Sequence, residues 1–328
     1  MTAVRIDALA REFGELVSTV DSEDAVALVE RALDDGADPM AVLVDVIAAA
    51  QRRVGFRWQR GEWSVAQEHA ATAVAVSATE AVTRRARLTP AARGRVVLAC
   101  AEREWHAMPA MIIGGALRGA GWSVTMLGAA TPAARLTQYL HDLGPDVTAV
   151  SCSMPGALPA TRRIIEASTA DGIPVLAGGP AFGTDSARAD ALGATAWAPT
   201  AREVAQVIAG LPPVVPAVPP LPAGPANEQA SLELDHEALA ATLLRQWSPG
   251  PDWLAADIKD VVDLALHCVG AALLTGDARP LPDTAAWVSD LLTSRGADNT
   301  TAGELGEQLA HVLREYPLAR NLVTAHWA

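Results

Sequence analysis

The sequence has few of the residues that mark several common protein classes. Three cysteines, Cys100, Cys152 and Cys268, lie far apart without a CxxC pair, so we expect buried free thiols and neither a disulfide framework nor a zinc site. Only 25 Lys and Arg stand against 38 Asp and Glu, a net charge of −13. This balance, without a basic cluster, disfavours direct DNA binding. No GxSxG, P-loop or HExxH motif occurs.

Long apolar runs are also missing. No uninterrupted stretch of about 18 apolar residues occurs, so no membrane span is expected. The first residues, MTAVRIDALAREFGEL, carry charges within an apolar pattern and no small-residue cleavage site, unlike a secretory signal. We therefore expect a cytoplasmic chain with no membrane partner. Its large aromatics are almost all Trp, nine against three Phe and two Tyr, and indole rings often wall flat ligands.

The hydrophobic pattern divides the chain into four parts. Residues 1–90 have apolar residues at helical spacing and predict a four-helix antiparallel bundle. Residues 91–211 alternate short Val-rich runs with helical stretches, which predicts a doubly wound, Rossmann-like parallel sheet of five strands. Residues 212–229 hold seven prolines and predict a semi-rigid linker, and residues 230–328 predict an all-helical C-terminal domain. The five strands are expected at 95–101, 122–127, 146–153, 173–178 and 194–198.

Ligands of such sheets bind beyond the carboxyl ends of the strands. The loop after the first strand contains His106, and an imidazole at this place can bind a transition metal. The carboxylate of Glu104, two residues earlier, can hold the other ring nitrogen. Taken alone, His106 could equally be an ordinary loop histidine. The later strand ends carry small or hydroxyl residues and one aromatic residue: Ser151, Ser153, Gly178, Gly179 and Phe182.

Together these residues resemble the cobalamin-binding domain of methionine synthase, the corrinoid methyl carriers and the methylmalonyl mutases. The family signature is Asp-x-His-x-x-Gly, then a Ser-containing strand end, then Gly-Gly; Glu104 stands at the Asp position and His106 at the His position. The resemblance covers about residues 10–210 and implies a flavodoxin-like fold. It implies that His106 binds cobalt from below while the displaced base of the cofactor enters the sheet past Ser151. Pro109 replaces the family's Gly.

A second motif lies in the expected bundle, where Trp58 is followed after nine residues by Glu68-His69. This spacing resembles the light-sensing repressors that use adenosylcobalamin. The resemblance implies that Trp58 covers the adenosyl group and that Glu68 contacts it. It also implies that His69 binds cobalt once light has broken the cobalt–carbon bond. A tryptophan and a histidine packed in a helical core are the alternative. Those repressors have a helix-turn-helix domain before the bundle, which we do not expect here.

The added C-terminal domain resembles the arrangement in photocobilins, which also hold biliverdin in a helical domain of globin-like character. His267 in a long expected helix is the candidate ligand-binding residue. Each candidate of this domain, taken alone, could be structural. Three tryptophans could wall a flat tetrapyrrole and two arginines could pair with its propionates: Trp247, Trp253, Trp287, Arg279 and Arg295.

The sequence therefore predicts a photoreceptor, not an enzyme, with adenosylcobalamin and biliverdin as cofactors. His106 and His69 are the predicted cobalt ligands. A corrinoid methyl carrier and a cobalamin-binding interaction module without photochemistry are the alternatives. We expect a homo-oligomer, most simply a dimer, and an unidentified downstream protein partner.

Overall fold

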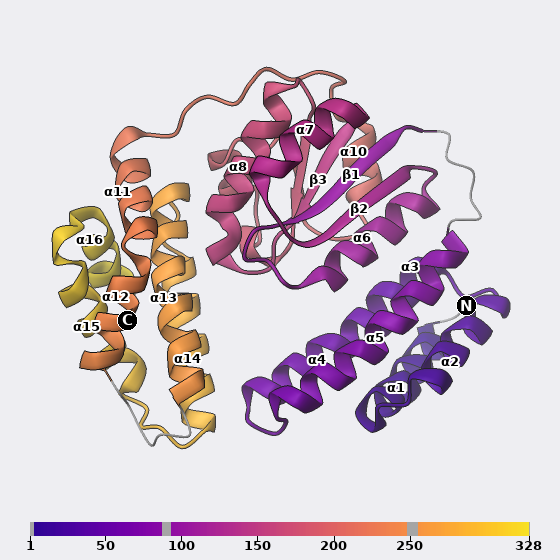
Figure 1. Cartoon of the computed structure of the whole chain (residues 1–328). Helices are drawn as coiled ribbons and strands as arrows, with labels where there is room; N and C mark the ends of the chain where they lie inside the picture. Colours follow the sequence, from indigo (N-terminus) through magenta and orange to yellow (C-terminus); the bar gives the residue numbers. More distant parts are fainter. Residues whose placement is uncertain (1–2, 87–92, 248–254, 328) are drawn as a thin grey trace.

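The computed structural model describes residues 3–86, 93–247 and 255–327 (Figure 1). The predicted fold class is confirmed, because a helical cap, a five-stranded parallel sheet covered by helices on both faces and a set of C-terminal helices follow one another along the chain. The three cysteines are buried free thiols, as predicted. Across the described residues, no helix has both the length and the apolar character needed to cross a membrane.

The cap is a bundle in which α3, η1 and α4 form one continuous helix. The carboxylate of Asp38 accepts a hydrogen bond from the backbone N–H of Ala41 at 3.1 Å, and Pro39 occupies the first helical position, so this helix begins where the sequence favours it. Its buried apolar face packs on α1 and α5. The elements are α1 (Ala3–Thr19), α2 (Ser22–Asp34), α3 (Pro39–Ala41), η1 (Val42–Ile47), α4 (Ala48–Gln59) and α5 (Val65–Ala86).

The sheet has the strand order β2-β1-β3-β4-β5, all parallel. This order places a topological switch between β1 and β3, and the crevice for a ligand lies at their carboxyl ends. The strands are β1 (Arg95–Ala101), β2 (Ser123–Thr131), β3 (Val147–Ser151), β4 (Val175–Gly178) and β5 (Ala196–Ala198). β2 extends beyond its predicted end at 127, because Ala101 pairs with Thr131 after a shift in register.

Helices cover both faces of the sheet (Figure 1). Successive side chains of β1 point to opposite faces, so Val97 lies in the core with α7 and α8, and Leu98 lies in the core with α6 and α10. The sheet helices are α6 (Ala107–Gly119), α7 (Ala133–Leu143), η2 (Pro155–Ala157), α8 (Leu158–Ala170), η3 (Pro180–Phe182), α9 (Ala187–Ala191) and α10 (Val204–Ala209).

The proline-rich segment differs from the predicted linker in two ways. Its last part, residues 223–229, belongs to helix α11, because Pro225 lies in the first turn, where a missing N–H costs no hydrogen bond. The rest runs along the sheet domain, where the N–H of Val215 donates to the carbonyl of Gly172 at 3.0 Å and Arg162 donates to the carbonyl of Pro219 at 2.5 Å. The segment is therefore docked on the sheet domain.

The C-terminal helices surround α13, which contacts α11, α12, α14 and α16. Trp327 is buried in this core and donates its indole N–H to the carbonyl of Ala302 at 2.8 Å. The last helix, α16, begins at Pro317. The elements are α11 (Ala223–Leu234), α12 (His236–Gln246), α13 (Ala255–Thr275), α14 (Pro280–Ser294), α15 (Thr301–Val312), η5 (Leu313–Glu315) and α16 (Pro317–His326).

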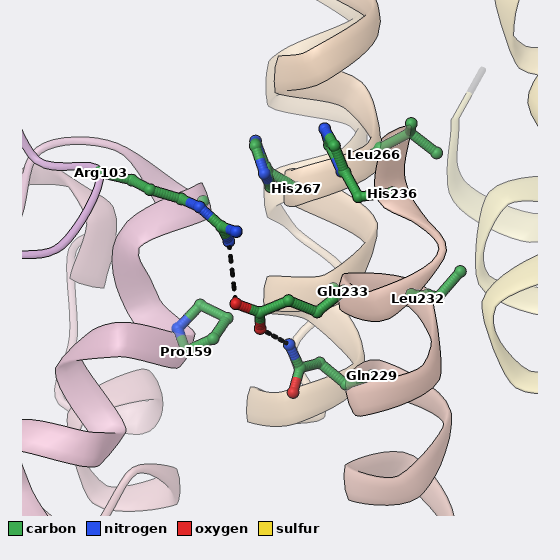
Figure 2. Close-up of a pocket in the computed structure, with 10 residues that line it drawn as sticks. Arg103, Pro159, Gln229, Leu232, Glu233, His236, Leu266 and His267 are labelled. Atoms are coloured by element: carbon green, nitrogen blue, oxygen red, sulfur yellow. Dashed lines mark hydrogen bonds and ion pairs between the residues drawn. The ribbon is translucent and has the colours of Figure 1, made fainter. Parts of the chain in front are cut away.

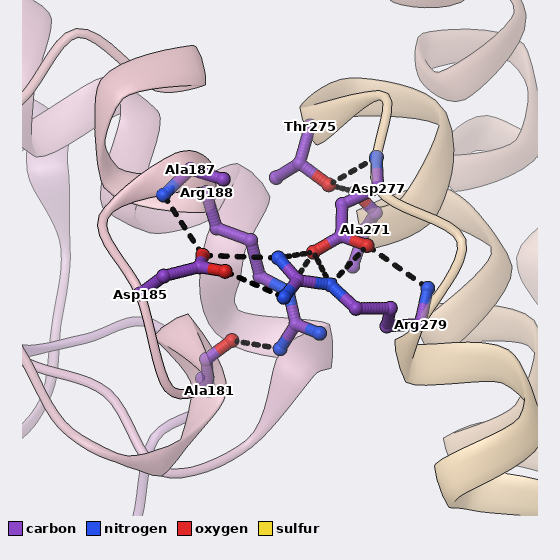
Figure 3. Close-up of polar contacts among 8 residues, drawn as sticks. All are labelled: Ala181, Asp185, Ala187, Arg188, Ala271, Thr275, Asp277 and Arg279. Atoms are coloured by element: carbon purple, nitrogen blue, oxygen red, sulfur yellow. Dashed lines mark hydrogen bonds and ion pairs between the residues drawn. The ribbon is translucent and has the colours of Figure 1, made fainter.

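A buried ion pair joins the C-terminal helices to the sheet domain. Nε of Arg188, on α9, lies 2.8 Å from a carboxylate oxygen of Asp277, which follows α13, and the two side chains are 5% and 11% exposed. Arg188 also donates to the carbonyl of Ala181 at 2.8 Å. Arg279 extends the network to Asp185 at 2.6 Å on the surface (Figure 3).

Candidate functional site

The loop after β1 makes a tight turn before α6. Arg103 has a left-handed backbone with φ +68°, which is rare for a residue with a Cβ and is concentrated at functional sites. The N–H of Glu104 donates to the carbonyl of Ala101 at 3.0 Å. The turn places His106 at the N-terminal end of α6, beside the switch point of the sheet.

The carboxylate of Glu104 is fully buried and accepts four hydrogen bonds. One oxygen accepts from the backbone N–H of His106 at 2.8 Å and from Nδ1 of its ring at 2.7 Å. The other accepts from the backbone N–H of Ser153 and, at 3.0 Å, from that of Met154. Burial alone would raise the pKa of Glu104, but these hydrogen bonds outweigh it and lower the pKa below its ordinary value. Glu104 thus joins the loops after β1 and β3.

The contact between Glu104 and His106 is the one that the sequence predicts. A carboxylate only accepts hydrogen bonds, so the proton of a neutral His106 ring lies on Nδ1 and the lone pair on Nε2. The side chain is 57% exposed. The hydrogen bond to Glu104 raises the pKa of His106 against the effect of burial, and the charge of Glu68 on α5 adds to the rise. Glu68 therefore lies close enough to His106 to interact electrostatically across the cap–sheet boundary.

The ends of β3 and β4 carry two buried serine hydroxyls and two glycines. The hydroxyl oxygens of Ser151 and Ser153 are buried and have no hydrogen-bond partner among the described residues. Gly179 has φ +112°, and a Cβ there would lie 2.3 Å from the carbonyl oxygen of Cys152, so only glycine fits. A Cβ on Gly178 would lie 3.3 Å from a backbone oxygen. Phe182 differs from the prediction, because its side chain is fully buried in the core and does not line an open site.

On the cap side, Glu68 and His69 lie in the first turns of α5. Glu68 accepts a hydrogen bond from the hydroxyl of Thr72 at 2.7 Å, and Thr72 accepts one from Gln51 at 2.6 Å, so the carboxylate is held by α4 and α5 together. Nδ1 of His69 lies 2.8 Å from the carbonyl oxygen of Val65 and therefore donates to it. This leaves Nε2 for a metal ion, and the side chain is 73% exposed.

Trp58 lies at the end of α4, where the cap contacts the C-terminal helices. Its ring centroid is 6.0 Å from that of Trp287 on α14, with the planes inclined by 35°. The guanidinium of Arg295 lies 5.3 Å from the Trp58 ring. Trp58 is half-buried against the C-terminal core. Trp58 therefore packs against a helical core, that of the C-terminal helices, as in the alternative of a structural tryptophan, and its role toward a cofactor stays a prediction.

The residues proposed to hold biliverdin do not form one site. Trp247 is buried in the C-terminal core, and Trp253 lies outside the described residues. Arg279 is engaged by Asp185 and Asp277, and Arg295 by Asp257. The arginines that were expected to pair with propionates thus already have carboxylate partners, Asp257 on α13 for Arg295, and Asp277 and Asp185 for Arg279.

His267 lines a small pocket between the sheet domain and the C-terminal helices (Figure 2). Its ring stacks on that of His236 with 4.2 Å between centroids, and Arg103 forms an ion pair with Glu233 at 3.3 Å across the pocket. Burial, with the charges of His236 and Arg103, lowers the pKa of His267 to about 4, so the ring is neutral at pH 7. The cavity holds about 20 Å³, room for one water molecule and too small for a tetrapyrrole.

Two residues beside the predicted site were not singled out from the sequence. Trp105 is 75% exposed directly before His106, which is unusual for an indole at a sheet edge. Its position in the same loop was visible in the sequence. The positive φ of Arg103 had no sequence signal, because neither Gly nor Asn occupies the position.

Two family models match the chain in adjoining parts. Residues 94–209 match a model described as the B12 binding domain, and residues 9–83 match a second model with that description. The matches cover the sheet and most of the cap. The C-terminal helices lie outside both matched ranges.

Curated relatives fall into two groups. The HTH-type transcriptional repressor CarA of Myxococcus xanthus is 33% identical over 147 residues, which are 44% of this chain and 47% of CarA, so the chain spans about half the length of that relative. The trimethylamine corrinoid protein of Methanosarcina barkeri is 25% identical over 205 residues, which are 60% of this chain and 94% of that protein. The solved monomethylamine corrinoid protein of Methanosarcina barkeri matches with a TM-score of 0.55 at 16% identity, over 61% of this chain and 96% of that one. This last similarity shows the fold alone.

Proposed function

We propose that this cobalamin-binding chain is a light sensor that holds adenosylcobalamin between its cap and its sheet. The observation that carries the proposal is the position of Trp58, which is separated by nine residues from Glu68-His69 and contacts Trp287 and Arg295 of the C-terminal helices. A cap that is held at this end by a third domain is suited to sealing a bound group. It is less suited to opening for a methyltransferase.

The residues at the sheet edge fit the lower half of cobalamin. The buried hydroxyls of Ser151 and Ser153 lack partners in the described parts of the chain, and a bound nucleotide tail would supply them. Gly179 lets the loops after β3 and β4 pack closely on each other, because a Cβ there would lie 2.3 Å from the carbonyl oxygen of Cys152. No three His, Cys, Asp or Glu side chains of the described residues form a metal site by themselves. Cobalamin would bring its cobalt already bound in the corrin ring, so a single donor side chain such as His106 would be enough to hold the metal.

Each side chain then has a distinct role. The cofactor supplies a cobalt–carbon bond that visible light cleaves. His106 would hold cobalt from below through Nε2, because Glu104 fixes the proton on Nδ1. Trp58 would cover the adenosyl group. His69, whose Nδ1 donates to Val65, would offer Nε2 as the second cobalt ligand once the adenosyl group has gone.

The alternative function is a corrinoid methyl carrier. The observation that favours it is the match over 94% of the trimethylamine corrinoid protein, against 47% of CarA. A methyl carrier must expose the upper face of the corrin to a partner enzyme. Illumination would then yield no photoproduct that depends on His69.

Biliverdin as a second chromophore has less support from the structure, because the pocket that His267 lines is small. The C-terminal helices, which lie outside the B12-binding matches, are where we propose that biliverdin would bind. Purified chain with excess biliverdin should show a red absorption band with induced circular dichroism. Absence of an induced signal rejects this part alone.

The decisive experiment loads the full chain with adenosylcobalamin in the dark, illuminates it and records absorbance. The parent should convert to a stable bis-histidine spectrum, and His69→Ala should bind normally but give a water-ligated product. His141→Ala is the matched control, because its side chain is 74% exposed, against 73% for His69. A parent that keeps its dark spectrum, or a His69→Ala product identical to that of the parent, would exclude the light-sensing scheme.

The lower ligand is tested in the same assay. His106→Ala removes the donor nitrogen, so cobalamin should bind base-on or not at all. Glu104→Gln keeps the shape but loses the negative charge and one of the two accepting oxygens, so it cannot accept from both His106 and the loop after β3. Loss of such a partner lowers metal-site affinity by about 10- to 100-fold. Circular dichroism checks that the variants are folded. An unchanged base-off spectrum in His106→Ala would contradict the assignment.

A further inference from the structure

The end of α4 that carries Trp58 is capped by residues of another domain. Nη2 of Arg295 donates to the carbonyl oxygen of Trp58 at 3.2 Å, and Nη1 donates to that of Gln59 at 3.0 Å. The hydroxyl of Ser294 donates to the Gln59 carbonyl at 2.9 Å. The last carbonyls of a helix lack partners within it and carry the negative end of its dipole, so a guanidinium and a hydroxyl stabilise this end.

Arg295 is also held by a carboxylate of its own domain. Its Nε lies 3.1 Å from a carboxylate oxygen of Asp257 on α13, and its side chain is only 10% exposed. The same guanidinium lies 5.3 Å from the Trp58 ring, within the range of cation–π attraction. Trp287 adds an aromatic contact at 6.0 Å. The C-terminal domain thus contacts both the backbone and the ring of Trp58.

The turn after α4 is shaped for this close contact. Gly61 has φ +69°, and a Cβ there would lie 3.3 Å from the carbonyl oxygen of Ser294. A larger residue would both strain the turn and push it away from α14. The fit therefore involves both sides, the turn of the cap and the last turn of α14.

We infer that Arg295 and Trp287 are positioning residues for Trp58, through which the C-terminal domain sets the preference of the cap for the adenosyl form of cobalamin. The inference rests on the proposed role of Trp58 as the cover of the adenosyl group. Because coupling between sites is reciprocal, loss of that group must in turn change the contact between α4 and α14. This makes α14 the element that detects the state of the cofactor.

The test is a dark titration of the full chain with adenosylcobalamin and, separately, with methylcobalamin. Arg295→Gln and Trp287→Ala should weaken binding of adenosylcobalamin about tenfold relative to methylcobalamin, the size expected when one charged or aromatic contact is lost. A purely structural role would weaken both equally. Arg314→Gln is the control, because Arg314 is 62% exposed and pairs with its neighbour Glu315.

A double-mutant cycle tests whether Arg295 acts on cobalamin binding through Trp58. If Arg295 acts through Trp58, Arg295→Gln should change the adenosyl-to-methyl ratio in the parent and leave it unchanged in Trp58→Ala. An unchanged ratio in Arg295→Gln, or equal weakening of both cobalamins, overturns the inference even when the parent responds normally to light. A parent that prefers adenosylcobalamin but does not respond to light refutes the sensor and leaves the inference standing. A parent without that preference overturns both.

Discussion

The C-terminal helices meet their two neighbours through different kinds of contact. Against the sheet domain they form the buried ion pair between Arg188 and Asp277 (Figure 3). They also pack so closely there that a Cβ on Gly156 would lie 2.6 Å from Cβ of His267. Against the cap they use the rings of Trp58 and Trp287 and the hydrogen bonds of Arg295.

The two contacts differ in the energetic cost of losing one of the interacting partners. Removal of one partner of the ion pair leaves the other as an unpaired charge in a buried place, which is costly. The contact with the cap combines ring faces with hydrogen bonds to helix-end carbonyls. If this contact is lost, the carbonyls and their donors can form hydrogen bonds with water instead. The comparison teaches that the contact with the sheet domain depends on a buried charge pair, and that the contact with the cap depends on rings and helix-end hydrogen bonds.

The largest expected effect is that of Asp277→Ala. It leaves the guanidinium of Arg188, 5% exposed, without its carboxylate. Removal of one partner of a buried pair costs about 3–5 kcal/mol, so the free energy of unfolding in urea should fall by that amount. Asp185→Ala, in the exposed part of the same network, is the control. Equal losses of unfolding free energy in the two variants would contradict the distinction between the buried and the exposed parts of the network.

A smaller effect is expected for Trp287→Ala at the contact with the cap. Truncation of a fully buried Trp costs about 3–5 kcal/mol, and this ring is partly buried, so a loss of about 2 kcal/mol is expected. Urea unfolding measures it. A loss as large as that of Asp277→Ala would show that the cap is held as firmly as the sheet domain.

The pH dependence sharpens the same comparison. Burial alone would raise the pKa of Asp277, but hydrogen bonds from Arg279 and Arg188 hold the pKa well below its ordinary value. A depressed carboxyl pKa contributes stability that is present above the unfolded pKa of about 4 and is lost as the pH falls below it. The difference in unfolding free energy between the parent and Asp277→Asn should therefore narrow below about pH 4. A constant difference would contradict this sign.

The smallest effect is expected for Arg279→Gln. Arg279 and Asp185 are 47% and 50% exposed, so solvent and salt screen their attraction. Arg279 also pairs with Asp277, but Asp277 keeps its buried partner Arg188 in this variant. The urea midpoint should hardly change, and less still at high salt. A change comparable to that of Asp277→Ala would mean that the surface part of the network stabilises the interface as much as the buried part.

Much of the fold could be predicted because it follows from local patterns. The strand expected at residues 95–101 has the observed bounds of β1. The predicted end of the linker at residue 229 was wrong, because α11 already begins at Ala223. In the sequence, a proline in a first helical turn cannot be told from a proline in an extended segment. The contact of Glu104 with His106 followed from a spacing of two residues in one loop.

The contacts between domains could not be predicted in this way. Arg295 and Arg279 were expected to meet propionates, and both proved to be paired with carboxylates. A charged residue on a helix shows in the sequence only that it can form an ion pair. Its partner is decided by how the helices pack.

The sequence by itself therefore determined the strand–helix alternation and the loop that joins Glu104 to His106. Both depend on residues close together in the chain. Only the tertiary structure decided that Trp58 meets Trp287 and that Arg188 meets Asp277. Those pairs are far apart in sequence and are brought together when the apolar faces of separate domains are buried, a process that depends on the shape of the whole fold.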